Sequence, residues 1–175
     1  QLSRTELCEI YSGATKEWAP LGWKRGGEII ALTAGPRWGI FAYLEQTLLQ
    51  SGAYAKTIYA PPTEEEAVEV VATRANAIAC VSRVYAERAG ARVRILRVSQ
   101  ALGLPYVALN RETLMTRTYP LLRPISIATS AKPSATASAF ITFASGMDGQ
   151  RIVARHGYVP AAVPIEIIRT SEGTP

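Results

Sequence analysis

Short apolar runs alternate along the chain with longer segments whose apolar residues recur at helical spacing. The short runs predict β-strands at residues 28–33, 56–60, 76–80, 92–98, 123–129 and 162–169. The longer segments predict α-helices at residues 5–13, 38–52, 61–74 and 134–158, the last broken near Gly146. Because strands alternate with helices, the pattern predicts an α/β fold with a largely parallel sheet.

Two of the predicted helices carry clear start signals. Ser3 is a candidate N-cap with Glu6 as its capping-box partner, and Gly13 is a natural stop for that helix. Thr63 follows Pro62 at the start of the third helix, and the run Glu64, Glu65 and Glu66 suits the positive end of its dipole. We interpret this run as a solvated first turn rather than a metal site.

Composition narrows the class of protein. The chain has 175 residues, 48% of them hydrophobic, which is enough for one ordinary domain or two small lobes. The net charge is +5, but the arginines are scattered and no nucleic-acid-binding motif occurs, so we expect no nucleic-acid partner. No apolar run reaches about 18 residues, so no membrane span is predicted.

Candidate catalytic and metal-binding chemistry is sparse. Cys8 and Cys80 are the two cysteines and His156 is the one histidine, which argues against a zinc site. The cysteines are either two buried thiols or, in an exported protein, one disulfide. No nucleophile motif or spaced carboxylate pair indicates an enzyme, and no cofactor is predicted.

Four segments, in order, carry a resemblance to a known family. They are QLSRTELCEIYSGATKEW at residues 1–18, NAIACVSRVYA at 76–86, YPLLRPISIAT at 119–129 and AFITFASGMDGQRIVARHGYVP at 139–160. Together they resemble phosphate-type periplasmic solute-binding proteins, the substrate-binding components of ABC importers. The resemblance implies a type II periplasmic-binding-protein-like α/β fold, with two lobes, a hinge of crossing strands and an oxyanion held between the lobes.

The resemblance also implies a division of the chain. Residues 1–98 correspond to lobe two, 99–124 to the hinge crossover, and 125–175 to the strands and helices that return to lobe one. The chain therefore represents one complete lobe plus the returning part of the other, and the family's opening segment has no counterpart here. That segment would lie on another chain, or would have been removed or lost. Arg123 falls in the hinge, where we interpret it as a structural contact.

The turn TAGPRW, residues 33–38, occupies the position where the family holds phosphate, but its residues differ. Leu32 and Ala34 stand where the family has Arg and Asp, and Pro36, Arg37 and Trp38 replace its Ser-Gly-Thr. Pro36 removes an N–H donor, so we do not carry the phosphate site over. Helix starts nevertheless favour anions.

We therefore predict ligand contacts from Thr33, Gly35, Arg37 and Trp38. Two of these have alternatives, since Arg37 would also suit a surface loop and Trp38 would also suit a plug that fills the old cleft.

Two functional hypotheses remain open. The first is a non-enzymatic solute-binding protein that binds a small anion other than free phosphate and delivers it to an ABC transporter permease. The second is an interaction or scaffold protein that kept the fold, lost the ligand and binds a second protein chain. The first hypothesis predicts a periplasmic or extracellular location. No signal peptide is present in this chain, so it is either a mature or trimmed form or a cytoplasmic protein, such as a sensor domain.

Overall fold

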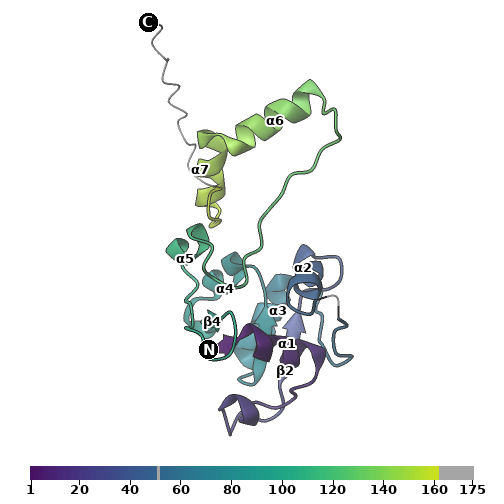
Figure 1. The fold of residues 1–175 in the computed structure, drawn as a ribbon, viewed down its shortest axis with the longest axis vertical. Coiled ribbons are helices and arrows are strands. Elements are labelled where there is room, and N and C mark those ends of the chain that lie inside the picture. The colour runs from purple at the N-terminus through teal and green to yellow at the C-terminus, as the bar shows by residue number, and fades with distance from the viewer. Residues whose placement is uncertain (51, 162–175) are drawn as a thin grey trace, which may run out of the picture. The chain divides into compact units, whose positions relative to one another are not determined.

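The computed structural model describes residues 1–50 and 52–161. It divides the chain into two compact units, residues 1–124 and residues 125–175. Figure 1 shows the elements along the chain. The lobe boundaries expected from the sequence remain a prediction, because this division concerns compactness alone.

The first unit holds two pairs of parallel strands. β2 (Ile30–Thr33) pairs with β3 (Ala77–Cys80), and β1 (Leu2–Ser3) pairs with β4 (Val98–Ser99). A single parallel bridge between Tyr59 and Leu32 extends the first pair on the other side of β2. The predicted parallel pairing is therefore present, in shorter strands than expected.

Helices and 3-10 turns connect these strands (Figure 1). In chain order they are α1 (Arg4–Ser12), η1 (Ala19–Leu21), α2 (Gly39–Thr47), α3 (Glu64–Thr73), α4 (Arg83–Ala89), η2 (Gly90–Arg92) and α5 (Arg111–Met115). The predicted start of α1 is confirmed: Ser3 and Glu6 form a reciprocal capping box, and Gly13 takes a left-handed conformation. α2 ends earlier than expected, because the N–H groups of Leu48 and Leu49 both turn back to the Leu44 carbonyl.

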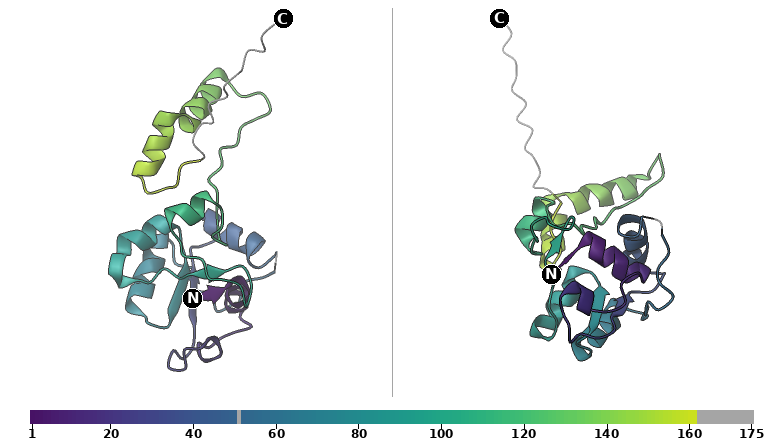
Figure 2. Two further views of the ribbon diagram at one scale, coloured as in Figure 1. Left: turned by 60° about the vertical axis from the view of Figure 1, so that its left-hand side comes forward. Right: turned by 60° about the horizontal axis from the view of Figure 1, so that its bottom comes forward.

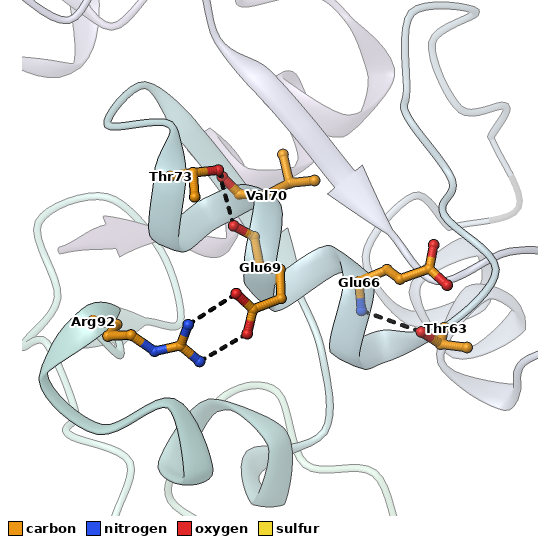
Figure 3. A network of polar contacts seen from close by, with 6 residues as sticks. All are labelled: Thr63, Glu66, Glu69, Val70, Thr73 and Arg92. Carbon is orange, nitrogen blue, oxygen red and sulfur yellow. Dashed lines mark hydrogen bonds and ion pairs between the residues drawn. The ribbon is translucent and has the colours of Figure 1, made fainter.

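The surface of α3 is tied to the turn that follows α4. Thr63 caps α3 by accepting a hydrogen bond from the Glu66 N–H, and Arg92 in η2 forms a bidentate ion pair with Glu69 (Figure 3). Hydrogen bonds from Arg92 lower the pKa of Glu69. Both side chains are exposed, so we assign this pair an orienting role rather than a large share of stability.

The hydrophobic core of the first unit lies between α1, α2 and the two strand pairs. Tyr11, Leu44 and Leu32 are fully buried, and the Tyr11 hydroxyl donates to the Leu32 carbonyl at 2.9 Å. Leu32 stands where the resemblance would place an arginine. Its complete burial explains that departure, because an unpaired guanidinium at this position would have no access to water.

Three predicted strands differ from the structure. Residues 56–60 contribute only the Tyr59 bridge. Within 92–98, Arg92 belongs to η2 and only Val98 enters β4. Residues 123–129 form no strand: Ile125 and Ile127 are 69% and 52% exposed, and no described segment pairs with them. The predicted strand at 162–169 lies outside the described residues.

The described part of the second unit contains two helices, α6 (Ala135–Ser145) and α7 (Met147–Arg155), with a sharp bend between them (Figure 2). The predicted break near Gly146 is confirmed. Gln150 fastens the bend, since its amide donates to the Ala144 carbonyl at 2.6 Å and accepts from the Ala161 N–H at 2.8 Å. Gly149 is required here, because a side chain would collide with the Phe143 carbonyl.

Candidate functional site

The candidate site lies at the carboxyl ends of β2 and β3. Thr33 and Cys80 are register partners at the last positions of these strands. Backbone hydrogen bonds join the loop after β2 to the segment before α3: Thr33 N–H donates to Tyr59, and Gly35 N–H donates to Pro61. In α/β folds, the crevice outside the carboxyl ends of parallel strands is the usual place for a ligand.

The four residues predicted from the sequence do not share one environment. Thr33 and Gly35 are buried, whereas Arg37 and Trp38 are exposed. The Gly35 N–H is not free for an anion, because it is bonded to Pro61. Arg37 makes no side-chain hydrogen bond or ion pair with any residue in the described ranges. Its assignment as a ligand contact therefore remains a prediction.

Trp38 is held in place rather than buried as a plug. Its indole N–H donates to the Pro62 carbonyl at 2.6 Å, while 37% of the residue remains exposed. It is also the N-cap of α2, and it gives the helix no side-chain capping bond. The ring is thus a fixed apolar surface beside the helix start.

The start of α2 offers unpaired backbone donors. The N–H groups of Arg37, Gly39 and Ile40 form no hydrogen bond with any described residue. No acidic residue occupies the first turn of α2, so the positive end of the helix dipole is uncompensated locally. Such an end favours a negatively charged partner.

Arg123 reaches this helix start, which the sequence analysis did not predict. A Cβ atom added at Gly39 would lie 2.9 Å from Nη1 of Arg123, so the guanidinium passes directly over the first residue of α2. The sequence placed Arg123 at the hinge and gave no signal of this contact, because α2 lies far away along the chain. A cation against the positive end of a helix is an unfavourable pairing unless an anion joins them.

A hydrogen-bonded chain links Arg123 to a buried carboxylate. Nη2 of Arg123 donates to the Ser82 hydroxyl at 3.2 Å, and that hydroxyl donates to Glu64 at 3.0 Å. The Ser82 N–H also donates to Glu64. Glu64 is only 4% exposed, so the sequence interpretation of a wholly solvated first turn is wrong for this residue. Glu65 and Glu66 are exposed, as expected.

The floor of the site is weakly polar. Burial, and then the charge of Glu64, raise the pKa of the Cys80 thiol to about 12, while Arg123 acts in the opposite direction. Both cysteines are free thiols in the structure, which is the first of the two alternatives that the sequence left open. The Thr33 hydroxyl is fully buried and has no hydrogen-bond partner of good geometry in the described part of the chain. It lies close enough to Tyr54 to influence the pKa of that phenol, which burial raises.

Two absences hold for residues 1–50 and 52–161. No group of three or more His, Cys, Asp or Glu side chains is placed to hold a metal ion. No helix there is long and apolar enough to cross a membrane.

Comparison with known proteins defines the class to which this fold and site belong. A model of the periplasmic-binding-protein (PBP) superfamily domain matches residues 1–146. The chain therefore belongs to the PBP superfamily, a family of substrate-binding proteins rather than enzymes. The α/β periplasmic-binding-protein-like fold predicted from the sequence is confirmed. A search of curated proteins finds no significant match.

Several solved structures share the fold of this chain. A phosphate ABC transporter substrate-binding protein from Clostridium perfringens, solved with bound phosphate, is similar with a TM-score of 0.73 and 18% identity, covering 91% of this chain and 63% of that one. PstS from Borrelia burgdorferi is similar with a TM-score of 0.66 and 18% identity, and the match covers 92% of this chain and 64% of that one. A phosphate transport receptor from Vibrio cholerae is similar with a TM-score of 0.70 and 16% identity, and the match covers 91% of this chain and 63% of that one. The chain thus spans less than two thirds of the length of these proteins.

Proposed function

We propose that the chain is the anion-holding part of a non-enzymatic solute-binding protein for ABC transport. The main evidence is the guanidinium of Arg123, which lies over the first residue of α2. Three backbone N–H groups at this helix start form no hydrogen bond with any described residue. An anion between them would be bound by the arginine fork and by the helix start together. Its binding would also relieve the repulsion between the two positive features.

This proposal changes the expected set of ligand contacts. Arg123 supplies the guanidinium that Leu32 does not, and the backbone of Arg37 and Gly39 supplies N–H donors. Trp38 lies between Arg37 and Gly39 in the sequence and Thr33 ends β2, while Gly35 shapes the turn through its bond to Pro61 rather than contacting a ligand. A ligand held in this way would be delivered to a permease from the periplasm or the extracellular side, as the relatives' transport roles suggest.

Isothermal titration calorimetry of Arg123→Ala tests this proposal. With a panel of oxyanions and organic acids, we expect binding to the native chain and at least a tenfold loss of affinity in the variant, as for the loss of a charge-assisted hydrogen bond worth about 1.5–3 kcal/mol. Arg94→Ala is the matched control, because Arg94 is exposed and its side chain makes no hydrogen bond or ion pair with any described residue. Equal affinity in Arg123→Ala and Arg94→Ala would contradict the role of Arg123.

The second candidate function, an interaction or scaffold protein, has its own supporting observation. No residue of α6 is buried. Large apolar residues of α6 and α7 are exposed to solvent: the exposed fraction is 58% for Phe140, 50% for Phe143 and 60% for Met147. A hollow on this unit is lined by Phe143 and Ile152 together with Arg151 and Arg155. Exposed apolar side chains in this number are typical of a surface that another protein covers.

A further inference from the structure

The hollow on the second unit combines apolar side chains with charges of both signs. Phe143 of α6 and Ile152 of α7 line it, together with Asp148, Arg151 and Arg155. Phe143 is 50% exposed and Ile152 is 39% exposed. The side chains of Asp148 and Arg151 are exposed as well, at 76% and 66%. A partner that fits this hollow must therefore offer both apolar contact and charged groups.

The bend between α6 and α7 holds the hollow in shape. Gly149 lies so close to the Phe143 carbonyl that a Cβ atom there would come within 2.3 Å of it. The Gln150 amide also donates to the Ala144 carbonyl at 2.6 Å. Because these contacts lie within the unit, Phe143 is kept beside α7 before any partner arrives. A surface that is already formed loses little conformational entropy when it is covered.

Three residues on one face of α7 lead from an acid through an apolar residue to a base. Asp148, Ile152 and Arg155 follow the spacing i, i+4 and i+7, which places them along a single helix face. Among the described residues, the Asp148 carboxylate pairs with Arg151 alone, at 3.1 Å, in an exposed contact. The Arg155 guanidinium forms no hydrogen bond or ion pair with any residue that the structure describes. This face therefore carries an accessible anion and an unpaired cation, one at each end.

This order of charges is self-complementary when a second helix of the same sequence runs in the opposite direction. The point midway between positions 148 and 155 falls next to Ile152, so a two-fold axis there would bring Ile152 against its own copy. The same axis would place Asp148 opposite Arg155 of the second copy, and the reverse contact would follow by symmetry. Two copies in the same direction would instead put acid against acid and base against base, which is unfavourable.

We propose, on the basis of the interaction function given above as the second candidate, that a second copy of this chain covers the hollow, with the two α7 helices packed antiparallel. The antiparallel copy pairs both charges of the face, whereas a partner of one charge sign would leave either Asp148 or Arg155 unmatched. It also covers Phe143 and Ile152, which removes apolar surface from water. Because α7 has nine residues, the contact is small, and the association is weak and reversible.

Charge reversal at the two ends of the face tests this arrangement by analytical ultracentrifugation. Asp148→Arg alone and Arg155→Asp alone each set like charges opposite each other twice in the antiparallel pair. We expect each variant to weaken self-association by at least about fivefold, because two exposed ion pairs become two repulsive contacts. An equimolar mixture of the two variants restores both pairs and should associate as the native chain does. Arg94→Asp, a reversal at an exposed site in the first unit, is the matched control and should associate normally.

Salt separates a lost charge pair from a lost helix. At about 1 M sodium chloride the repulsion is screened while the apolar contact remains, so each single variant should regain association. Native association of both single variants in low salt overturns the antiparallel contact and leaves the interaction function standing. A loss of association that neither mixing nor salt reverses also overturns it. A native chain that is monomeric at all concentrations contradicts both the contact and the interaction function, and leaves the anion site unaffected.

Discussion

At the scale of single residues, Gly39 decides whether Arg123 can reach α2. The missing side chain leaves the space that the guanidinium occupies, since a Cβ atom there would lie 2.9 Å from Nη1. Gly39 is the first residue of the helix, and nothing in the local sequence indicates that its side-chain position is taken by a residue near the end of the first unit.

Gly39→Ala therefore separates binding from stability. We expect anion affinity to fall several-fold, because the new methyl group displaces Arg123. Stability should be unchanged or higher by up to about 1 kcal/mol, because alanine favours the helix over the unfolded chain. Calorimetry and urea unfolding on the same sample measure the two effects. A loss of stability with unaltered binding would show that Arg123 does not depend on this space.

Cys80 gives a second residue-scale prediction. Because its pKa is raised to about 12, the thiol stays protonated at neutral pH and should react slowly with Ellman's reagent. In Cys8→Ser, which leaves Cys80 as the single thiol, we expect slow modification in buffer and rapid modification in guanidinium chloride. Rapid reaction of the folded variant at pH 7 would contradict the environment described for Cys80.

The same pKa shift predicts how stability responds to alkali. The folded thiol holds its proton more strongly than the unfolded one, whose pKa is near 9. This contribution is therefore complete below about pH 9 and is lost as the pH rises towards 12. Comparing the unfolding free energies of native and Cys80→Ser proteins between pH 8 and pH 10.5 tests the sign, since the substituted chain should lose less stability.

At the scale of elements, side-chain caps mark the starts of α1, α3, α5 and α6. The α1 capping box is complete: Ser3 Oγ accepts from the Glu6 N–H at 3.1 Å, and Glu6 accepts from the Ser3 N–H at 2.7 Å. Ser3 is fully buried and also belongs to β1, so one residue joins the strand pair to the helix.

Ser3→Ala should cost about 1–2 kcal/mol of unfolding free energy, towards the upper range for loss of an N-cap, because the capped groups are shielded from water. Ser12→Ala is the matched control: Ser12 is exposed at the other end of α1 and should contribute little. Urea unfolding followed by circular dichroism measures both. Equal costs would show that the capping box adds nothing beyond an exposed serine.

At the scale of the whole molecule, the second unit presents apolar side chains that its own two helices do not cover. We expect the chain to self-associate reversibly as its concentration rises, because burying the phenylalanines of α6 is favourable. Phe140→Ser combined with Phe143→Ser should weaken this association at least tenfold. Lys132→Ala, on the same unit, serves as the control. Light scattering that shows a monomer at all concentrations would argue against the scaffold function.

The sequence alone determined the features that depend on neighbouring residues. These include the α/β class, the strands β2 and β3 predicted from their apolar runs, the caps of α1 and α3 and the break at Gly146. Each follows from local backbone preferences, which act within a few residues. The family itself was also readable, because the order of four local motifs survived in the chain.

The tertiary structure decided everything that needs a distant partner. The apolar runs at 92–98 and 123–129 had the composition of strands, but a strand forms only where another strand can share its hydrogen bonds. The local sequence around Glu64 predicts a solvated helix start, but in the folded chain its carboxylate is buried and accepts hydrogen bonds from Ser82. Arg123 lies far from Gly39 along the chain, so only folding could bring its charge to α2, and that juxtaposition defines the candidate anion site.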